Sequence, residues 1–253
     1  MSGPSNPGSL RATGQSQVPS NKSSTKIPVT DRVKRVPKPS HPLLRQLVDF
    51  YHPMLAGPDW KGRYFDRLLD LPTEDYDGPT DFIGWLFPLP ERVGAETSPE
   101  AAAPVLDQLA FMYMRQEEAI GQNLKLALIR ILDIYGFNIQ YTKHSTTEVP
   151  VITELSGGKG KFQFWGTTLS HHHERIARII RSTRILGYES MGLAIMRAFH
   201  KAVKDWDLFG SWPAQTALAV LDSWRRAGES PLQEALDGKT YAPWLSKHWN
   251  SNF

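Results

Sequence analysis

The chain has 253 residues, of which 40% are hydrophobic and 11% aromatic, enough apolar side chains for the core of one domain or at most two. It contains no cysteine, which excludes disulfides, thiolate metal sites and a cysteine nucleophile, and which suits the reducing nucleus or cytoplasm. The formal net charge is +3, but residues 1–38 contain seven basic residues and one acidic residue. The remainder is therefore slightly acidic and is a poor candidate for broad binding to nucleic-acid phosphates.

The first 40 residues are rich in Ser, Pro, Gly and basic residues and poor in large apolar ones. Such a segment cannot bury enough apolar surface to offset its loss of conformational entropy, so we predict that residues 1–40 are disordered. The run 32–38 is either a nuclear localisation signal or, as is commoner for short basic runs, a solvated linker. No apolar run approaches the ~18 residues that span a bilayer, so we expect no transmembrane segment.

Helical spacing of apolar residues begins after the tail. It predicts helices over residues 43–51 and 64–69, followed by an acidic loop that contains Glu74, Asp75 and Asp77. This loop is a solvated turn or, less readily, an acid/base cluster, because its Pro and Gly leave nothing to desolvate the carboxylates. A helical turn follows at residues 81–87, with Thr80 or Asp81 as its N-cap.

The second half of the chain continues the helical pattern. We predict helices at 98–112, 124–135, 170–186, 191–203 and 213–228, and a short C-terminal helix near Trp244 and Trp249. The chain should bend near Gln116, and Gly136 and Gly187 should end the helices that precede them. Residues 137–141 are briefly extended, and residues 142–161 form a long loop with a mobile Gly-Gly-Lys-Gly-Lys tip that lacks the spacing of a phosphate-binding loop. The expected fold is all-α, a single helical-bundle-like domain over residues 41–253.

Two polar patterns lie in the predicted helix at 170–186. His171, His172 and His173 suggest a metal site, but consecutive helical residues point in different directions and cannot all bind one ion, so a polar first turn is the simpler interpretation. Ser170 lacks the glycines of a nucleophile elbow and is better placed as an N-cap. The sequence therefore predicts no catalytic residue, no metal and no cofactor.

Arginines recur every three residues along the same helix, at Arg175, Arg178, Arg181 and Arg184. At this spacing they form a basic ridge that can bind phosphate or carboxylate, unless they pair with acidic residues of the domain itself. The aromatic cluster of Phe82, Trp85 and Phe87 is more often part of a core than of a ligand site. Our candidate binding residues are nevertheless the two segments together: Trp85, Phe87, His172, Arg175, Arg178, Arg181 and Arg184.

Three blocks of the sequence resemble the conserved domain of the opioid growth factor receptor family. Residues 81–91 read D-F-I-G-W-L-F-P-L-P-E and are similar to the family hallmark D-Y-I-Q-W-L-F-P, with Gly84 in place of Gln. Residues 123–137 are similar to its N-L-x-x-S-L-x-R-M-L-x-F-Y-G-L helix. Residues 165–187 are similar to its W-x-x-x-x-H-N-x-L-R-I-T-R-I-L-x-S-L-x-x-L-G-L helix, and the long repeats of the animal members are absent.

The resemblance implies a non-enzymatic receptor-type domain. The family is named for animal proteins that bind an opioid peptide of the Met-enkephalin type and act at the nuclear envelope and in the nucleus. The expected function is thus peptide or protein binding, with peripheral membrane association implied by the resemblance only. The alternatives are a nucleic-acid-associated nuclear protein that uses the basic tail and the arginine ridge, and a hydrolytic or metal enzyme that uses residues 171–173.

Overall fold

The computed structural model describes residues 35–77, 81–91, 103–144, 147–162, 164–168, 170–235 and 242–248. The predicted disordered residues 1–34 lie outside these ranges. Residues 35–40, the end of the predicted tail, contact the folded part: Val36 N–H donates to Gln116 Oε1 at 2.8 Å, and Arg35 forms an ion pair with Glu117 at 2.9 Å. The described helices are α1 Pro42–Tyr51, α2 Phe65–Leu69, η1 Thr73–Tyr76, α3 Ile83–Leu86, α4 Gln108–Gln116, α5 Glu118–Ile134, α6 Lys159–Phe162, α7 His172–Ile185, α8 Glu189–Asp205, α9 Ala214–Glu229 and η2 Pro243–His248.

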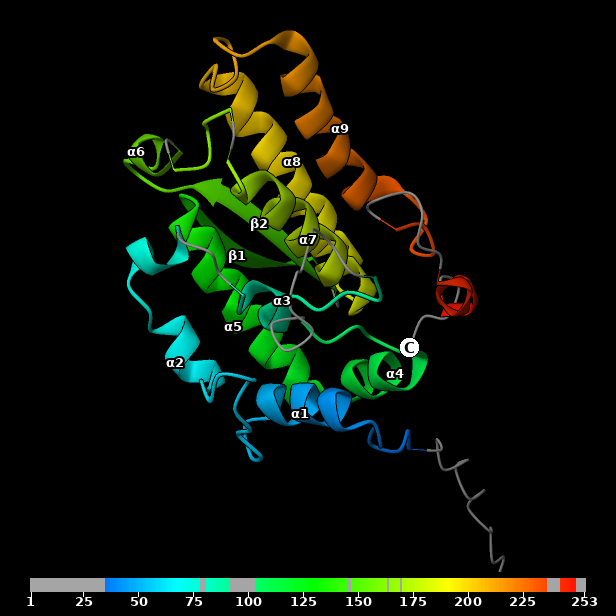
Figure 1. The fold of residues 1–253 in the computed structure, drawn as a ribbon. Coiled ribbons are helices and arrows are strands. Elements are labelled where there is room, and N and C mark those ends of the chain that lie inside the picture. Colours follow the sequence, from blue (N-terminus) through cyan, green and yellow to red (C-terminus); the bar gives the residue numbers. More distant parts are fainter. Residues whose placement is uncertain are drawn as a thin grey trace, which may run out of the picture. The chain divides into compact units, whose positions relative to one another are not determined.

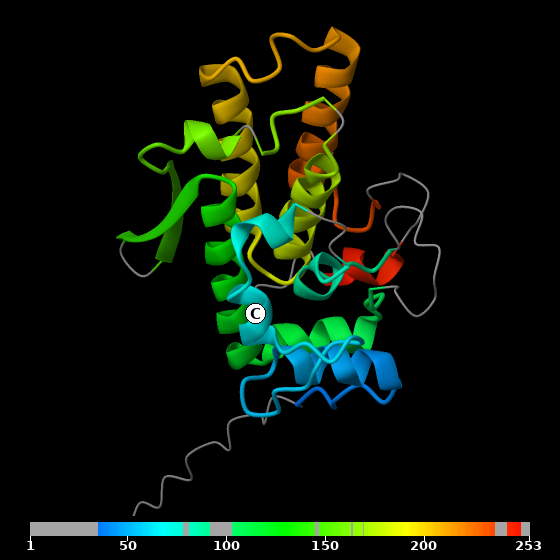
Figure 2. The same cartoon turned by 60° about the vertical axis from the view of Figure 1, so that its left-hand side comes forward.

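The predicted all-α fold is wrong, because the chain also forms an antiparallel hairpin of β1 Phe137–His144 and β2 Thr147–Glu154. Of the residues that the structure describes, 56% are helical, and the fold belongs to a mixed class of helices and sheet. The register pairs Phe137 with Glu154 and His144 with Thr147. Strand β1 packs on α5 and β2 packs on α8, so one face of the hairpin lies against these two helices (Figures 1 and 2).

The hairpin occupies most of the segment that we expected to be a loop. Its strands are rich in β-branched and aromatic residues, and Phe137, Ile139 and Ile152 pack in or against the core. The loop predicted at 157–161 is also wrong in its second half, because helix α6 begins at Lys159. In α6, Lys161 Nζ donates to Asp133 O at 2.8 Å and Phe162 is fully buried.

Most predicted helices are confirmed to within a few residues, including the bend near Gln116 and the left-handed glycines Gly136 and Gly187 that end α5 and α7. The helix predicted from residue 98 is the exception. Residues 98–102 lie outside the described ranges, and the helix starts only at α4, where Asp107 Oδ1 accepts the Ala110 N–H at 2.7 Å. The preceding segment is extended, and Leu106 N–H donates to Leu89 O.

Helices α7, α8 and α9 pack on one another, and α7 lies in the interior (Figure 1). Nearly every side chain of α7 from Ile176 to Ile185 is buried, the polar ones included. Helices α1 and α4 lie together at the other end, and α5 runs between this end and the hairpin (Figure 2). Among the described residues, no helix combines the length and apolarity needed to cross a membrane.

The hallmark segment 81–91 passes through the centre of the fold. Phe82, Trp85 and Phe87 are buried, which confirms their expected place in the core. Tyr51 of α1 donates its hydroxyl to Leu86 O, and Ser182 of α7 donates to Pro88 O at 2.9 Å. The segment therefore connects α1 to α7 by hydrogen bonds as well as by apolar contact.

Candidate functional site

The residues predicted to bind a ligand come together, but inside the molecule. Trp85, Phe87, His172, Arg178, Arg181 and Arg184 are buried, and Arg175 is half-buried. The Trp85–Phe87 turn and the arginine ridge lie directly against each other, and Arg178 Nε donates to Phe87 O at 2.8 Å. A ligand could reach the six buried side chains only if the packing around α7 opened, so their part in binding stays a prediction.

Each of the four arginines of α7 donates to a backbone carbonyl of a distant segment. Arg175 donates to Tyr76 O at 2.7 Å, and Arg184 donates to Ala227 O at 2.8 Å. Arg181 forms a buried ion pair with Glu91 and also donates to Leu232 O at 3.1 Å. The predicted alternative, pairing with acidic residues of the domain, therefore holds for Arg181 with Glu91 and for Arg184 with Glu189, at 3.3 Å. The contacts with backbone carbonyls were not predicted.

A more accessible candidate is an open groove of about 550 Å³ between α1, α2 and α5. This volume lies within the ~300–1,000 Å³ that is usual for ligand pockets. Two large side chains stand exposed in its wall: Tyr64 is 47% exposed and Leu126 is 50% exposed. The groove, which we call the α1–α2 groove, is lined by Phe50, His52, Pro53, Ala56, Tyr64, Phe65, Asp66, Arg67, Leu69, Asn123 and Leu126.

The floor of the α1–α2 groove is aromatic and rigid. The rings of Phe50 and Phe65 meet edge to face with centroids 5.5 Å apart, and Phe50 meets Trp85 of the hallmark segment at 5.6 Å. Asn123 of α5 donates to Tyr51 O at 2.7 Å and ties the opposite wall to α1. Trp85 thus supports the groove from below without being exposed in it.

The loop between α1 and α2 carries further apolar surface beside the groove. Met54 is 85% exposed and Leu55 is 50% exposed. The next residue, Ala56, has a φ of 42°, in the left-handed region that non-glycine residues seldom adopt. Backbone strain of this kind persists where the surrounding structure enforces it, and such positions cluster at binding sites. Here Ala56 lines the groove.

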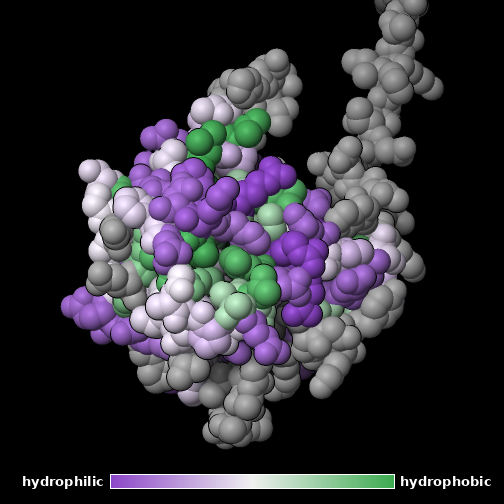
Figure 3. Space-filling model, turned by 90° about the horizontal axis from the view of Figure 1, so that it is seen from above, coloured by the Kyte–Doolittle hydropathy of each residue, from purple (hydrophilic) through white to green (hydrophobic). Residues whose placement is uncertain are grey.

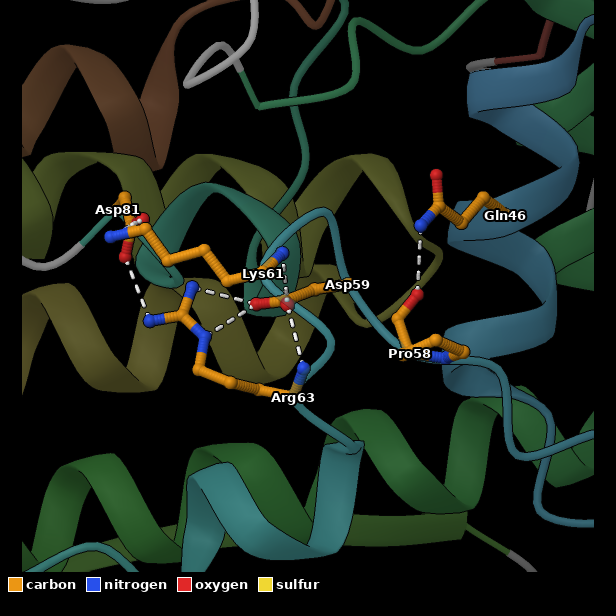
Figure 4. Close-up of polar contacts among 6 residues, drawn as sticks. All are labelled: Gln46, Pro58, Asp59, Lys61, Arg63 and Asp81. Carbon is orange, nitrogen blue, oxygen red and sulfur yellow. Dashed lines mark hydrogen bonds and ion pairs between the residues drawn. The ribbon is translucent and has the colours of Figure 1, made fainter.

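A buried carboxylate fixes the remainder of this loop (Figure 4). Asp59 Oδ1 accepts the backbone N–H groups of Lys61 and Arg63 at 2.8 and 2.9 Å, and Asp59 Oδ2 accepts from Arg63 Nε at 2.8 Å. On the α1 side, Gln46 Nε2 donates to Pro58 O at 3.0 Å. These bonds position the chain that leads into Tyr64 and the first turn of α2.

The same network reaches the start of the hallmark segment. Lys61 and Arg63 form ion pairs with Asp81 at 2.7 and 2.9 Å (Figure 4). The expected helix cap at Asp81 is therefore wrong, since α3 has no side-chain cap and Thr80 lies outside the described residues. Burial of Asp81 opposes its ionisation, but the hydrogen bonds from Lys61 and Arg63 outweigh burial and lower the pKa of Asp81.

The three histidines at 171–173, for which the sequence favoured a polar first turn over a metal site, do not all point the same way. His173 is buried and contacts Trp165 O at 2.8 Å through Nε2. His172 and His171 instead approach each other, with ring centroids 4.2 Å apart, and both face Asp77. Burial lowers the pKa of His172 to about 4, against the opposing effect of its bond to Asp77, so its ring is neutral at pH 7. Ser170 Oγ accepts the His172 N–H at 3.2 Å, close to its predicted capping role.

A second hollow, of about 290 Å³, lies between β2 and α8 and includes Glu154 and Lys201 in its lining. Figure 3 looks down on the end of the molecule that is uppermost in Figure 1 and shows apolar residues in the middle of that face, with hydrophilic residues around them. The hollow between β2 and α8 is smaller than the α1–α2 groove. Two of the residues that line it, Lys201 and Glu154, form an ion pair at 3.4 Å.

Comparison of the chain with family models, with curated proteins and with solved structures finds no match. The resemblance to the opioid growth factor receptor domain therefore rests on the sequence blocks alone.

The α1–α2 groove was not predicted from the sequence, although one signal for it is present. The buried face of α5 contains Leu124, Leu128 and Ile131, whereas Leu126 and Ile129 fall on the opposite face and are exposed. Apolar residues on the polar face of an amphipathic helix indicate a contact surface. The other wall depends on loop geometry that no periodicity reveals.

Proposed function

We propose that this chain is a non-enzymatic domain that binds a short, mainly apolar peptide segment in the α1–α2 groove. The observation that carries the proposal is the exposure of Tyr64 and Leu126 in the wall of a groove of about 550 Å³ with an aromatic floor. Tyrosine combines a large apolar ring with a hydroxyl at low entropic cost, which is why it is enriched in binding surfaces.

The polar groups of the groove favour a peptide over a small hydrocarbon. Asp66 and Arg67 are exposed neighbours in its lining and offer one charge of each sign, suited to an ammonium or guanidinium group and to a carboxylate. Asn123 adds an amide that already donates to Tyr51 O and retains acceptor capacity in its side-chain oxygen. A peptide with apolar side chains and free termini matches this combination.

The sequence resemblance supplies a specific probe. If the chain is an opioid growth factor receptor-like protein, the ligand class is a peptide of the Met-enkephalin type, which has an aromatic residue at its amino end, a Phe and a Met near its carboxyl end, and both termini charged. This composition is compatible with an apolar groove that carries one acid and one base. The proposal of peptide binding also accommodates a segment of a protein partner with the same chemistry.

Calorimetric titration of the full chain with Met-enkephalin tests the proposal, with a scrambled peptide of the same composition as the first control. We expect saturable binding with a Kd near or below ~1 µM, about −8 kcal/mol, for the true peptide alone. Tyr64→Ala and Leu126→Ser should each weaken binding roughly tenfold, because each removes an exposed apolar contact of the groove.

Leu218→Ser is the matched control, since Leu218 is also an exposed helical leucine. It lies on α9, is 66% exposed and does not line the groove. The substitution should leave the affinity unchanged. If Met-enkephalin gives no heat, a random heptapeptide display library should be selected on the full chain. The proposal fails if no selected peptide loses binding to Leu126→Ser while keeping its binding to Leu218→Ser.

A further inference from the structure

Three potential ligand atoms from two distant segments meet at the start of α7. Asp77 Oδ1 lies 3.1 Å from His172 Nε2 and 4.0 Å from His171 Nε2, and all three atoms lie within 4.8 Å of one another. In a tetrahedral zinc site with bonds of about 2.0–2.2 Å, neighbouring ligand atoms are about 3.3–3.5 Å apart. The observed separations bracket this value.

We propose that Asp77, His171 and His172 bind a divalent transition-metal cation of the Zn²⁺ class. Two imidazoles and one carboxylate are a ligand set that suits zinc and its neighbours better than Mg²⁺ or Ca²⁺, which prefer an all-oxygen shell. Three protein ligands leave the fourth position of a tetrahedron to water. Asp77 and His171 are exposed, so the cation can enter from solvent and the two side chains can close the remaining distance.

His172 anchors the site because its ring is fixed from both sides. It is 1% exposed, and its Nδ1 lies 3.1 Å from the hydroxyl oxygen of buried Tyr135. Without a metal, the neutral ring donates from Nε2 to Asp77 and accepts the Tyr135 hydroxyl at Nδ1. With a metal on Nε2, the ring proton resides on Nδ1 and is donated to the Tyr135 oxygen, the kind of supporting bond that orients a ligating histidine.

Two features oppose a bound cation and limit its affinity. Arg175 lies close enough for its charge to disfavour protonation of both His171 and His172, although its Nη1 is hydrogen-bonded to Tyr76 O. The positive end of the α7 dipole acts in the same direction. We therefore expect weaker binding than at a structural zinc site with four ligands. The metal would connect the end of η1 to α7, two segments 94 positions apart along the chain.

The test is calorimetric titration of the full chain, without a polyhistidine tag, with Zn²⁺ at pH 7.5. We expect saturable binding of one Zn²⁺ per chain with a Kd below about 100 µM, and no competition from Mg²⁺ or Ca²⁺. His171→Ala and Asp77→Asn, both at exposed positions, should each weaken binding at least tenfold. Tyr135→Phe should weaken it roughly tenfold as well, because it removes the bond that orients His172.

His41→Ala is the matched control, because His41 is an exposed histidine at the start of α1 and belongs to no part of the site. It should leave Zn²⁺ affinity unchanged, and a Co²⁺-loaded sample of it should keep a tetrahedral visible spectrum that His171→Ala loses. The proposal is overturned by absence of saturation below about 100 µM. It is equally overturned if either His171→Ala or Asp77→Asn binds Zn²⁺ as tightly as the unaltered chain. Peptide binding in the α1–α2 groove depends on none of these three ligands, so the two proposals fail or succeed separately.

Discussion

Gly84 shows how a single position restricts the packing of the hallmark segment. A Cβ built on Gly84 would overlap with the Cβ of Ala103 and would lie 3.1 Å from Nη2 of Arg178. The family pattern has glutamine at the matching place, so in this chain the neighbouring segment at Ala103 occupies the space that a side chain would need. The sequence departs from the pattern where the backbone of α3 meets another segment.

We expect Gly84→Ala to lower the free energy of unfolding by about 1–3 kcal/mol, because it forces an extra methyl group into a filled site. Urea denaturation measures the change. Gly160→Ala is the control, since no atom lies within 4 Å of a Cβ at that position, and it should be close to neutral. Adding Ala103→Gly to Gly84→Ala should recover part of the lost stability, and a double variant no more stable than Gly84→Ala would contradict the packing argument.

Asp81 should make the stability of the protein depend on pH. In the unfolded chain this carboxylate takes up a proton near its ordinary pKa of 3.8, whereas in the folded protein its pKa is lower. Between these two values the unfolded state binds more protons, so stability falls as the pH decreases through this range. The contribution of the ion pairs is complete above pH 3.8 and is lost below the folded pKa.

Asp81→Asn should therefore lower the free energy of unfolding by about 1–2 kcal/mol at pH 7, and the difference from the unaltered chain should shrink below pH 3.8. Chemical denaturation at a series of pH values measures both effects. Asp222→Asn removes an exposed carboxylate that pairs with Arg225 and Arg226, and it should change stability little at any pH. Equal loss at pH 7 and pH 2.5 would mean that the Asp81 charge is not the stabilising feature.

Helix α7 lies inside the protein although it contains four arginines. The arginine side chains are long enough for their guanidinium groups to reach segments 76–91 and 227–232. Backbone carbonyls of these segments accept hydrogen bonds from the guanidinium groups. Tyr76 and Ala227 lie in the last turns of η1 and α9, where helical carbonyls run out of intrahelical donors, and Phe87 and Leu232 lie in irregular backbone. The arginines thus satisfy buried carbonyls that regular secondary structure does not pair. The helix thereby serves as the polar as well as the apolar centre of the fold.

The buried Arg181–Glu91 pair offers a test of this role. Glu91→Gln leaves the Arg181 charge buried beside a neutral partner, so we expect it to lower the free energy of unfolding by about 3–5 kcal/mol. Arg181→Met combined with Glu91→Leu removes both charges and should be less destabilising than Glu91→Gln alone. Denaturant midpoints compare the two.

The matched control is Glu229→Gln, since Glu229 pairs with Arg225 at 3.9 Å on the exposed face of α9. It should be far milder than Glu91→Gln. If Glu91→Gln were as mild as this surface substitution, the buried pair would contribute little, and the position of α7 would depend on its apolar face.

At the scale of the whole molecule, segment 81–91 joins regions that are far apart in the sequence. It accepts hydrogen bonds from Tyr51 on one side and from Arg178 and Ser182 on the other, and its first residue is held by the loop that forms the α1–α2 groove. Two of the three blocks that resemble the family thus contact each other directly. The hallmark is a structural feature of this fold, and the proposed peptide groove lies on the surface that it supports.

The amino-acid sequence predicts most helices, their ends at Gly136 and Gly187, and the burial of Phe82, Trp85 and Phe87, because helical periodicity and local capping depend on neighbours within a few residues. It did not determine the hairpin, whose strands are stabilised by pairing with each other and by packing on α5 and α8. Nor did it distinguish an exposed arginine ridge from a buried one, since the spacing of the four arginines is the same in both cases.

The positions of the candidate sites follow from long-range packing of the chain. The α1–α2 groove needs Tyr64 and Leu126, which are 62 positions apart, and the proposed metal site needs Asp77 beside His171 and His172. In each case the chemistry depends on side chains brought together by long-range packing, and local pattern carries no information about such pairs. The resemblance to a receptor family suggests a class of peptide ligand, and the α1–α2 groove is the surface on which binding of such a peptide can be tested.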